Sequence, residues 1–249
     1  MSGHSKWSSI KHKKGAADAK RGKLFTKLAR AITVAARDGG SDPDGNPALA
    51  TAVQKAREAS MPKDNIQRAI DRGTGEGSDG VVIERILYEG YGPGGVAILV
   101  EALSDNRNRT GAEIRHAFDR HGGGLGEPNS VAWNFEKRGV ILVDGGRYDE
   151  DDLIVAIDAG AEDVVDDDGT FRILTAPGEL GAVRAALDEA GVEIVSSDIA
   201  MDPKNTVAVE ESQAKTLLNL IEALEEHDDV DAVHANFDIS EEVMERALA

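Results

Sequence analysis

The hydrophobic period of this chain changes once, at a glycine-rich segment that runs from Gly73 to Gly80. Before this segment, apolar residues recur every three to four positions, which is typical of amphipathic helices. After it, apolar and polar residues alternate in short runs that are separated by turn residues, which is typical of strands. The segment itself, GTGEGSDG, has the composition of a linker. The sequence therefore predicts a helical amino-terminal domain that is followed by domains containing strands.

Three helices are predicted before the linker. In the first, at about 19–37, apolar side chains share one side of a helical wheel, namely Leu24, Phe25, Leu28, Ala31, Ile32 and Ala35. The opposite side is a cationic stripe, which consists of Lys20, Lys23, Lys27, Arg30 and Arg37. Asn46 and Pro47 indicate the start of a second helix, because Asn is a good N-cap and Pro is favoured at the first helical position. A third helix is expected from about Met61 to Gly73, where a left-handed cap would suit glycine.

Strand patterns dominate after the linker. Runs at 85–91 and 95–102 are separated by Gly92, Pro93 and Gly94, which predicts a hairpin turn in preference to a phosphate loop. A helix at about 110–120 and a strand at 130–135 are expected next. Residues 139–203 then show the order βαββαβ, which is the split βαβ arrangement of ferredoxin-like domains.

The last stretch contains too few strands to form a domain alone. A strand at 206–209, a helix at 211–226, a strand at 230–238 and a short helix from Ser240 are expected there, and they most simply complete the sheet begun at Arg85. The predicted fold class is therefore α+β with three domains. These are a helical domain at 1–75, a middle α/β domain at 81–137 plus 204–249, and an inserted ferredoxin-like domain at 138–203.

Charge is segregated along the chain. The 249 residues carry a net charge of -18, but residues 1–72 hold 15 Lys and Arg against 7 Asp and Glu, a net of +8, which leaves -26 for the rest. An acidic protein repels nucleic acid unless its positive charge is gathered in one place, as it is here. The predicted partner is therefore nucleic acid.

Several classes of protein are disfavoured by the composition. The chain has no cysteine, which excludes disulfides, thiolate zinc sites and a cysteine nucleophile. It shows no run of about 18 apolar residues and no secretory signal, so no membrane association is expected and a cytoplasmic location fits. An organellar transit peptide is the alternative for the basic amino terminus. No feature requires an oligomer, and a monomer is compatible with the sequence.

The segment Gly3 to Lys14, GHSKWSSIKHKK, has a high density of cations around one tryptophan. Lysines neutralise phosphates and an aromatic ring can stack on an exposed base, so we expect a nucleic-acid-binding arm made of Lys6, Trp7, Lys11, His12, Lys13 and Lys14. The alternative is a solvated tail whose Trp7 packs on the helical domain. Metal binding by His4 and His12 is disfavoured by their spacing, and no metal site is predicted.

A second candidate contact is the segment Asp105 to Thr110, DNRNRT, at the junction of a predicted strand and helix. Arg107 and Arg109, together with helix amides, could hold a phosphate there. A capped helix start with solvated arginines explains the segment equally well. The two interpretations stay open at this point.

No catalytic constellation is found. The chain shows no Ser/His/Asp arrangement, no HExxH motif and no dinucleotide fingerprint in a convincing context, so no enzyme activity and no cofactor are predicted. The acidic runs at 149–152 and 166–168 lack the pattern of a calcium loop and are expected to be solvated turns. A metal-dependent hydrolase using these runs is the least favoured alternative.

The residues singled out above closely resemble the YebC family of bacterial and organellar gene-expression regulators, which includes mitochondrial translational activators. The matching stretches are 3–7, 10–14, 19–28, 61–73, 88–97, 105–110 and 217–239. The resemblance implies three domains, the third inserted in the second. It also implies a probable DNA-binding transcriptional regulator, with ribosome-associated factors that help translation through difficult sequences among other members. The partners implied by the resemblance are therefore DNA or ribosomal RNA, and also the ribosome.

The leading expectation is thus a non-enzymatic regulator of gene expression that binds nucleic acid through the arm and the cationic stripe, with Arg107 and Arg109 as a second contact. One alternative is an RNA- or ribosome-binding translation factor that relieves stalling. Another is a protein-interaction scaffold whose acidic α/β domains bind basic partners. Charge alone does not separate DNA from RNA, because both carry phosphates.

Overall fold

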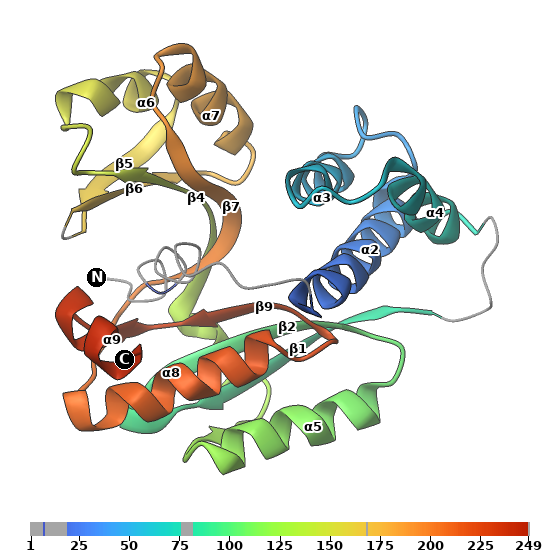
Figure 1. Cartoon of the computed structure of the whole chain (residues 1–249), viewed down its shortest axis with the longest axis vertical. Helices are drawn as coiled ribbons and strands as arrows, with labels where there is room; N and C mark the ends of the chain where they lie inside the picture. Colours follow the sequence, from blue (N-terminus) through green and yellow to red (C-terminus); the bar gives the residue numbers. More distant parts are fainter. Residues whose placement is uncertain (1–6, 8–18, 76–81, 168, 249) are drawn as a thin grey trace.

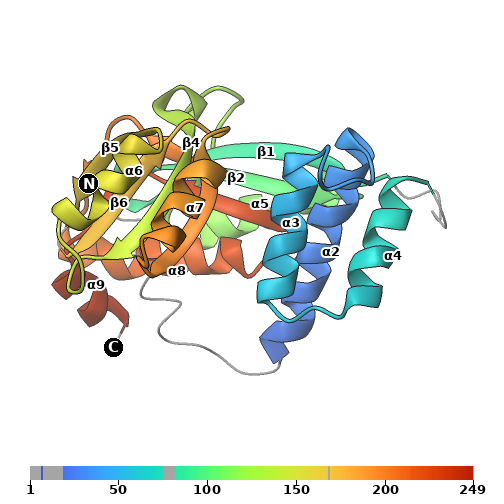
Figure 2. The same cartoon turned by 90° about the horizontal axis from the view of Figure 1, so that it is seen from above.

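The computed structural model describes Trp7 and residues 19–75, 82–167 and 169–248. Figure 1 shows three bodies: a helical bundle, a middle sheet with helices on one face, and a second sheet with its own helices. The bundle and the second sheet both stand on the face of the middle sheet that is opposite α5 (Arg107–Arg120) and α8 (Glu211–Glu225), as the view from above confirms (Figure 2). We call this side of the middle sheet the open face.

The helical bundle consists of α2 (Ala19–Gly39), α3 (Pro47–Glu58) and α4 (Lys63–Gly73). Its core contains Ile32, Leu49 and Ile70, as the apolar pattern predicts, whereas Leu24 is 44% exposed. Asn46 caps α3 by accepting a hydrogen bond from the backbone N–H of Leu49 at 3.1 Å. The Asn46 side chain also donates to the Ala35 carbonyl at 2.8 Å, so one buried amide both starts α3 and fixes it to α2.

The left-handed cap expected at Gly73 is wrong. Gly75, two residues later, has the positive φ of 92°, while Gly73 is the last residue of α4. A Cβ on Gly73 would lie 2.4 Å from the Thr33 carbonyl oxygen in α2. Glycine is therefore required there by the close approach of two helices and not by a turn.

The middle sheet has the strand order β3-β1-β2-β9, and every neighbouring pair is antiparallel. Its strands are β1 (Glu84–Tyr91), β2 (Ala97–Ser104), β3 (Gly124–Leu125) and β9 (Val230–Ala235). The expected hairpin is confirmed: Tyr91 pairs with Ala97 across a turn that contains the short helix η1 (Pro93–Gly95). Side chains of β2 that face α5 and α8 form the main core with Ile114 and Leu217.

The end of the chain completes this body only in part. Strand β9 joins β2, as expected, and α9 (Glu241–Leu248) buries Met244 in the same core. The strand expected at 206–209 does not join the sheet. Instead, β8 (Val207–Ala208) pairs in parallel with β10 (Phe237–Asp238) as a separate two-stranded sheet.

The strand expected at 130–135 is also wrong. A short helix, η2 (Ala132–Asn134), occupies half of this segment, and the next strand, β4 (Phe135–Asp144), begins only at its last residue. The carboxylate of Glu89 in β1 accepts backbone hydrogen bonds from Asn129 at 2.6 Å and from Val131 and Ala132 at 2.8 Å. A side chain thus satisfies the amides that a strand would pair with a neighbouring backbone.

The second sheet has the antiparallel strand order β5-β6-β4-β7. Its other strands are β5 (Ala161–Asp166), β6 (Thr170–Thr175) and β7 (Ile194–Pro203), and its helices are η3 (Asp151–Leu153), α6 (Ile154–Asp158) and α7 (Leu180–Glu189). This is the βαββαβ order predicted from the sequence, and the α+β fold class is confirmed. The domain boundaries at 75, 138 and 203 stay a prediction.

Ion pairs join the helical bundle to the second sheet. Lys55 of α3 lies 2.6 Å from Asp198 of β7, and Arg184 of α7 lies 3.5 Å from Glu58 of α3. The bundle therefore contacts the second sheet as well as the middle one. Within the described part of the chain, no helix is both long and apolar enough to cross a membrane.

Candidate nucleic-acid interface

The cationic stripe of α2 faces the loop between α8 and β9. Lys23 lies 3.4 Å from the carboxylate of Asp228, and Lys27 donates to the carbonyl oxygen of Glu225. Arg30 forms an ion pair with Asp229 and donates to the Asp228 carbonyl at 3.0 Å. Three cations of the stripe thus have partners within the chain. The stripe is an internal contact surface in addition to a candidate surface for phosphate.

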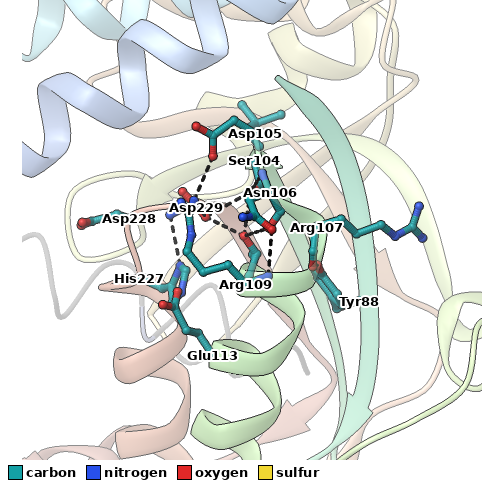
Figure 3. Close-up of polar contacts among 12 residues, drawn as sticks. Tyr88, Ser104, Asp105, Asn106, Arg107, Arg109, Glu113, His227, Asp228 and Asp229 are labelled. Atoms are coloured by element: carbon teal, nitrogen blue, oxygen red, sulfur yellow. Dashed lines mark hydrogen bonds and ion pairs between the residues drawn. The ribbon is translucent and has the colours of Figure 1, made fainter. Parts of the chain in front are cut away.

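Asp229 is the centre of this contact. Its side chain is 3% exposed, and besides Arg30 it accepts hydrogen bonds from three groups of the middle body (Figure 3). The donors are the Arg109 guanidinium at 2.7 Å, the Thr110 hydroxyl at 2.6 Å and the Ser104 hydroxyl at 3.2 Å. One carboxylate therefore links α2, the end of β2 and the first turn of α5.

The local sequence explains why an anion is held at this point. Asn106 is the N-cap of α5 and accepts from the Arg109 backbone N–H at 3.1 Å, which fixes the start of the helix beside Asp229. The amino-terminal end of a helix carries partial positive charge and stabilises a carboxylate. Burial alone would raise the pKa of Asp229, but hydrogen bonds from Thr110, Arg109 and Arg30 outweigh burial and hold this pKa far below its usual range.

The two arginines of the DNRNRT segment have different surroundings. Arg109 is engaged by Asp229 and also by Asp105 at 3.0 Å. Arg107 is exposed and points away from this cluster, while its backbone carbonyl accepts a hydrogen bond from the Tyr88 hydroxyl at 3.1 Å (Figure 3). The structure therefore does not bring the two guanidinium groups together. The capped helix start describes Arg109, whose partly exposed guanidinium is held by two carboxylates, while the Arg107 guanidinium points away from them.

A pocket of about 420 Å³ lies at this junction. It is lined by Lys23, Arg30, Arg109, Glu113, Glu226, His227, Asp228 and Asp229. His227 lies 2.8 Å from the carboxylate of Glu113, and its other ring nitrogen accepts from the Asp229 backbone N–H at 3.1 Å. The lining includes three Lys or Arg side chains and four carboxylates, so a phosphate in the pocket would compete with those carboxylates for the cations.

Trp7 is buried, which differs from the exposed, stacking ring expected of the arm. It is 3% exposed in the core of the middle body, not on the helical bundle, and its indole N–H donates to the Glu225 carboxylate at 3.2 Å. In this conformation the ring faces are covered by protein. The other arm residues, Lys6, Lys11, His12, Lys13 and Lys14, lie outside the described residues, as does the side chain of Lys20.

Arg37 lies at the far end of the stripe, away from Asp229. Its guanidinium forms an ion pair with Asp38 at 2.9 Å and donates to the carbonyl oxygen of Ile83, just before β1. Its side chain is 38% exposed. It remains accessible to a ligand, as does Lys23, whose side chain is 61% exposed.

Sequence reasoning missed the role of Asp229. A signal was present, because Glu225, Glu226, Asp228 and Asp229 form an acidic run at the carboxyl-terminal end of α8. Negative charge is unfavourable at the carboxyl-terminal end of a helix, so this run predicts that cations from another part of the chain lie beside it. The cationic stripe of α2 supplies them.

Comparisons with known proteins agree with the resemblance seen in the sequence. The family model described as the TACO1/YebC protein N-terminal domain matches residues 5–76, and the model for the TACO1/YebC second and third domain matches residues 83–237. A protein of Rubrobacter xylanophilus named "Probable transcriptional regulatory protein" is 60% identical over 245 residues, which cover 98% of each chain. A protein of Desulfotalea psychrophila with the same description is 60% identical over 248 residues, or 99% of each chain.

Among solved structures, a conserved hypothetical protein from Aquifex aeolicus is similar to this chain with a TM-score of 0.80 and 47% identity, over 90% of this chain and 93% of that one. The two family models meet between residues 76 and 83, where the helical bundle gives way to the first strand of the middle sheet. Since the models and the relatives span nearly the whole sequence, the chain belongs to the TACO1/YebC family.

Proposed function

We propose that this protein is a non-enzymatic regulator of gene expression that binds nucleic acid through cations of its amino-terminal arm and helical bundle, with Arg107 of α5 as a second contact. The names of its relatives support a regulatory role in transcription, which makes DNA the first target to test. The observation that carries the proposal is the charge distribution: residues 1–72 have a net charge of +8 in a protein whose total is -18. Nucleic acid is attracted to that part, whereas the remainder carries the net negative charge of the protein.

The ion pairs that the cationic stripe forms within the protein are compatible with this function, because the most exposed of those described above, between Lys23 and Asp228, is weak. The pair between Lys23 and Asp228 has both side chains 61% exposed, and exposed ion pairs contribute only about 0–1 kcal/mol. A phosphate can therefore replace Asp228 at small cost. Arg30 and Arg109 differ, because both hold the buried Asp229.

The proposal thus divides the cations into two groups. The contacts proposed for phosphate are Lys23, Lys27, Arg37 and Arg107, together with the arm lysines. Arg30 and Arg109 are proposed to hold the helical bundle in position, because each would leave a buried carboxylate without its partner if it moved to a phosphate.

The test is charge reversal at exposed positions. Lys23→Glu and Arg37→Glu are made singly and combined, and each single variant is matched in charge change by Lys215→Glu, at an exposed position of α8 outside the bundle. Binding of a short DNA duplex is measured at several salt concentrations. We expect weaker binding by the double variant and a salt slope that is smaller by about one per lost contact, whereas Lys215→Glu should keep the slope.

The proposal fails if the double variant binds with unchanged affinity and unchanged salt slope. A parallel measurement with single-stranded RNA distinguishes the two targets, because the polymer bound more tightly at equal salt identifies the favoured one. In cells, promoter occupancy compared with co-sedimentation with ribosomes separates transcriptional from translational regulation.

A further inference from the structure

Two exposed aromatic rings share one hydrogen-bond acceptor at the edge of the open face. Trp133 in η2 is 65% exposed and Tyr91 at the end of β1 is 43% exposed. The Tyr91 hydroxyl donates to the Ser130 carbonyl at 2.9 Å, and the Trp133 indole N–H donates to the same oxygen at 3.0 Å. The end of β1 and the segment at η2 thus each contribute one exposed ring, and both side chains are fixed to the same carbonyl oxygen.

Residues of the middle sheet fix the loop that carries Trp133. The carboxylate of Glu89, which is 6% exposed, binds three backbone amides of this loop, and Val131 packs against Leu99 on the open face. Burial would raise the pKa of Glu89, but the backbone N–H groups of Val131, Asn129 and Ala132 lower it below the usual range. The carboxylate stays ionised, so the loop keeps its shape over the physiological pH range.

The Trp133 ring faces solvent, although tryptophan rings are usually covered by other parts of the protein. Tryptophan is highly buried on average in folded proteins, and here a buried carboxylate and a residue with positive φ, Asn129 at 68°, hold one outside. The donors of both rings are already used within the chain. What the rings offer to a ligand is therefore their apolar faces and not a hydrogen bond.

Exposed lysines adjoin the segment that carries Trp133, and they are candidate contacts for the phosphates of a strand whose bases stack on the rings. Lys204 is exposed, and its backbone N–H donates to the Asn134 carbonyl of η2 at 2.7 Å, while Lys137 is exposed on β4. The nearby carboxylate of Glu101 is engaged by His234 at 3.1 Å and by Arg85 at 3.5 Å. Exposed Glu127 adds a negative charge to the loop, so the binding energy must come mainly from the rings.

We propose that Trp133 and Tyr91 form a stacking platform for unpaired bases of a single-stranded nucleic acid, with Lys204 and Lys137 as phosphate contacts. Aromatic rings beside cations bind single strands because the bases stack while the phosphates meet positive charge. A duplex cannot use the platform, since its base faces are covered by neighbouring bases. This inference rests on the proposed function and narrows its target.

The test compares a short single-stranded oligonucleotide with one of equal length and charge in which the bases are removed. RNA and DNA versions of the base-containing strand separate the two polymers. Trp133→Ala should bind the base-containing strand about 5- to 150-fold more weakly, and leave binding of the abasic strand and of duplex DNA unchanged. Trp133→Phe, which keeps a ring, should bind within a few-fold of the natural protein.

A second readout is tryptophan fluorescence. The chain has two tryptophans, and Trp7 is buried, so quenching by the base-containing strand should be lost in Trp133→Phe and retained in Trp7→Phe. Quenching that persists in Trp133→Phe would contradict the platform.

The outcomes separate this inference from the proposed function. If the natural protein binds duplex DNA but binds base-containing and abasic strands equally, the platform is wrong and the proposed function stands. If it binds none of the probes, both are wrong. If Trp133→Ala binds every oligonucleotide normally but loses a protein captured by the natural chain, the rings dock a protein and the platform is overturned.

Discussion

Arg30 in α2 and Asp229 after α8 form an ion pair across 199 positions of the sequence, and this pair joins the helical bundle to the middle body. The carboxylate is 3% exposed and the guanidinium is 23% exposed. The pair belongs to a network in which Arg109 and Thr110 satisfy the other carboxylate oxygen. A charge buried in this way is costly unless each of its partners stays in place.

Removing the charge of Asp229 should therefore destabilise the protein. We expect Asp229→Asn to lower the free energy of unfolding by about 3–5 kcal/mol, because Arg30 and Arg109 lose their common partner. Chemical denaturation measures this change. Asp228→Asn is the matched control, since the neighbouring carboxylate is 61% exposed and should change stability by less than about 1 kcal/mol. Equal stability of the two variants would show that the network contributes little.

The same carboxylate predicts how stability depends on pH. The pKa of Asp229 lies far below its usual range in the folded protein, whereas an unfolded chain has an aspartate pKa of about 3.9. Its stabilisation is therefore complete above about pH 5 and is lost as the pH falls through 3.9 toward the folded value. The difference in unfolding free energy between the natural protein and Asp229→Asn should narrow over this acidic range. A difference that stays constant from pH 6 to acid would refute the assignment.

Asp228 should compete with nucleic acid for Lys23. Removing its charge frees that lysine and reduces repulsion, so Asp228→Asn should bind duplex DNA about 1.5- to 5-fold more tightly at low salt, the factor expected for one exposed ion pair. Titration of a labelled duplex measures the effect. Asp158→Asn, which removes an exposed charge next to the second sheet, controls for net charge. An equal gain in both variants would mean that Asp228 does not mask the stripe.

Trp7 should stabilise the fold. Trp7→Ala is expected to cost about 3–5 kcal/mol of unfolding free energy, because a buried indole and its hydrogen bond to Glu225 are lost. Trp133→Ala is the matched control, since its ring is 65% exposed and should change stability by about 0.5 kcal/mol or less. Similar melting curves for both variants would argue that Trp7 is not held in the core.

The local features of this fold were predictable from the sequence. The apolar period identified α2, and Asn46 with Pro47 located the start of α3. The order of strands and helices after Gly139 identified the second sheet, because alternation and turn residues are local signals. Each of these features depends on residues that lie within a few positions of one another.

The features that were missed depend on distant residues. The residue pattern at 130–135 predicts a strand. Its actual conformation depends on backbone hydrogen bonds to the Glu89 carboxylate, about 40 positions earlier in the sequence. The helical pattern of α2 predicts that the cationic stripe faces solvent, whereas in the structure the acidic run at 225–229 forms ion pairs with it. Trp7 lies among lysines in the sequence, which predicts a binding role, whereas its partner in the core, Glu225, lies 218 positions later. Spacing along the chain carries no information about such pairs.

The ion pairs that join the helical bundle to its neighbours have a consequence for how the molecule responds to its surroundings. Lys55 with Asp198, Arg184 with Glu58 and Lys23 with Asp228 are all exposed contacts between separate bodies. Salt weakens such contacts through the same screening that weakens the attraction of lysine for phosphate. Ionic strength thus acts both on the position of the bundle relative to the other two bodies and on its affinity for nucleic acid. A polyanion that separates the bundle from its acidic neighbours would therefore also change how the three bodies are arranged.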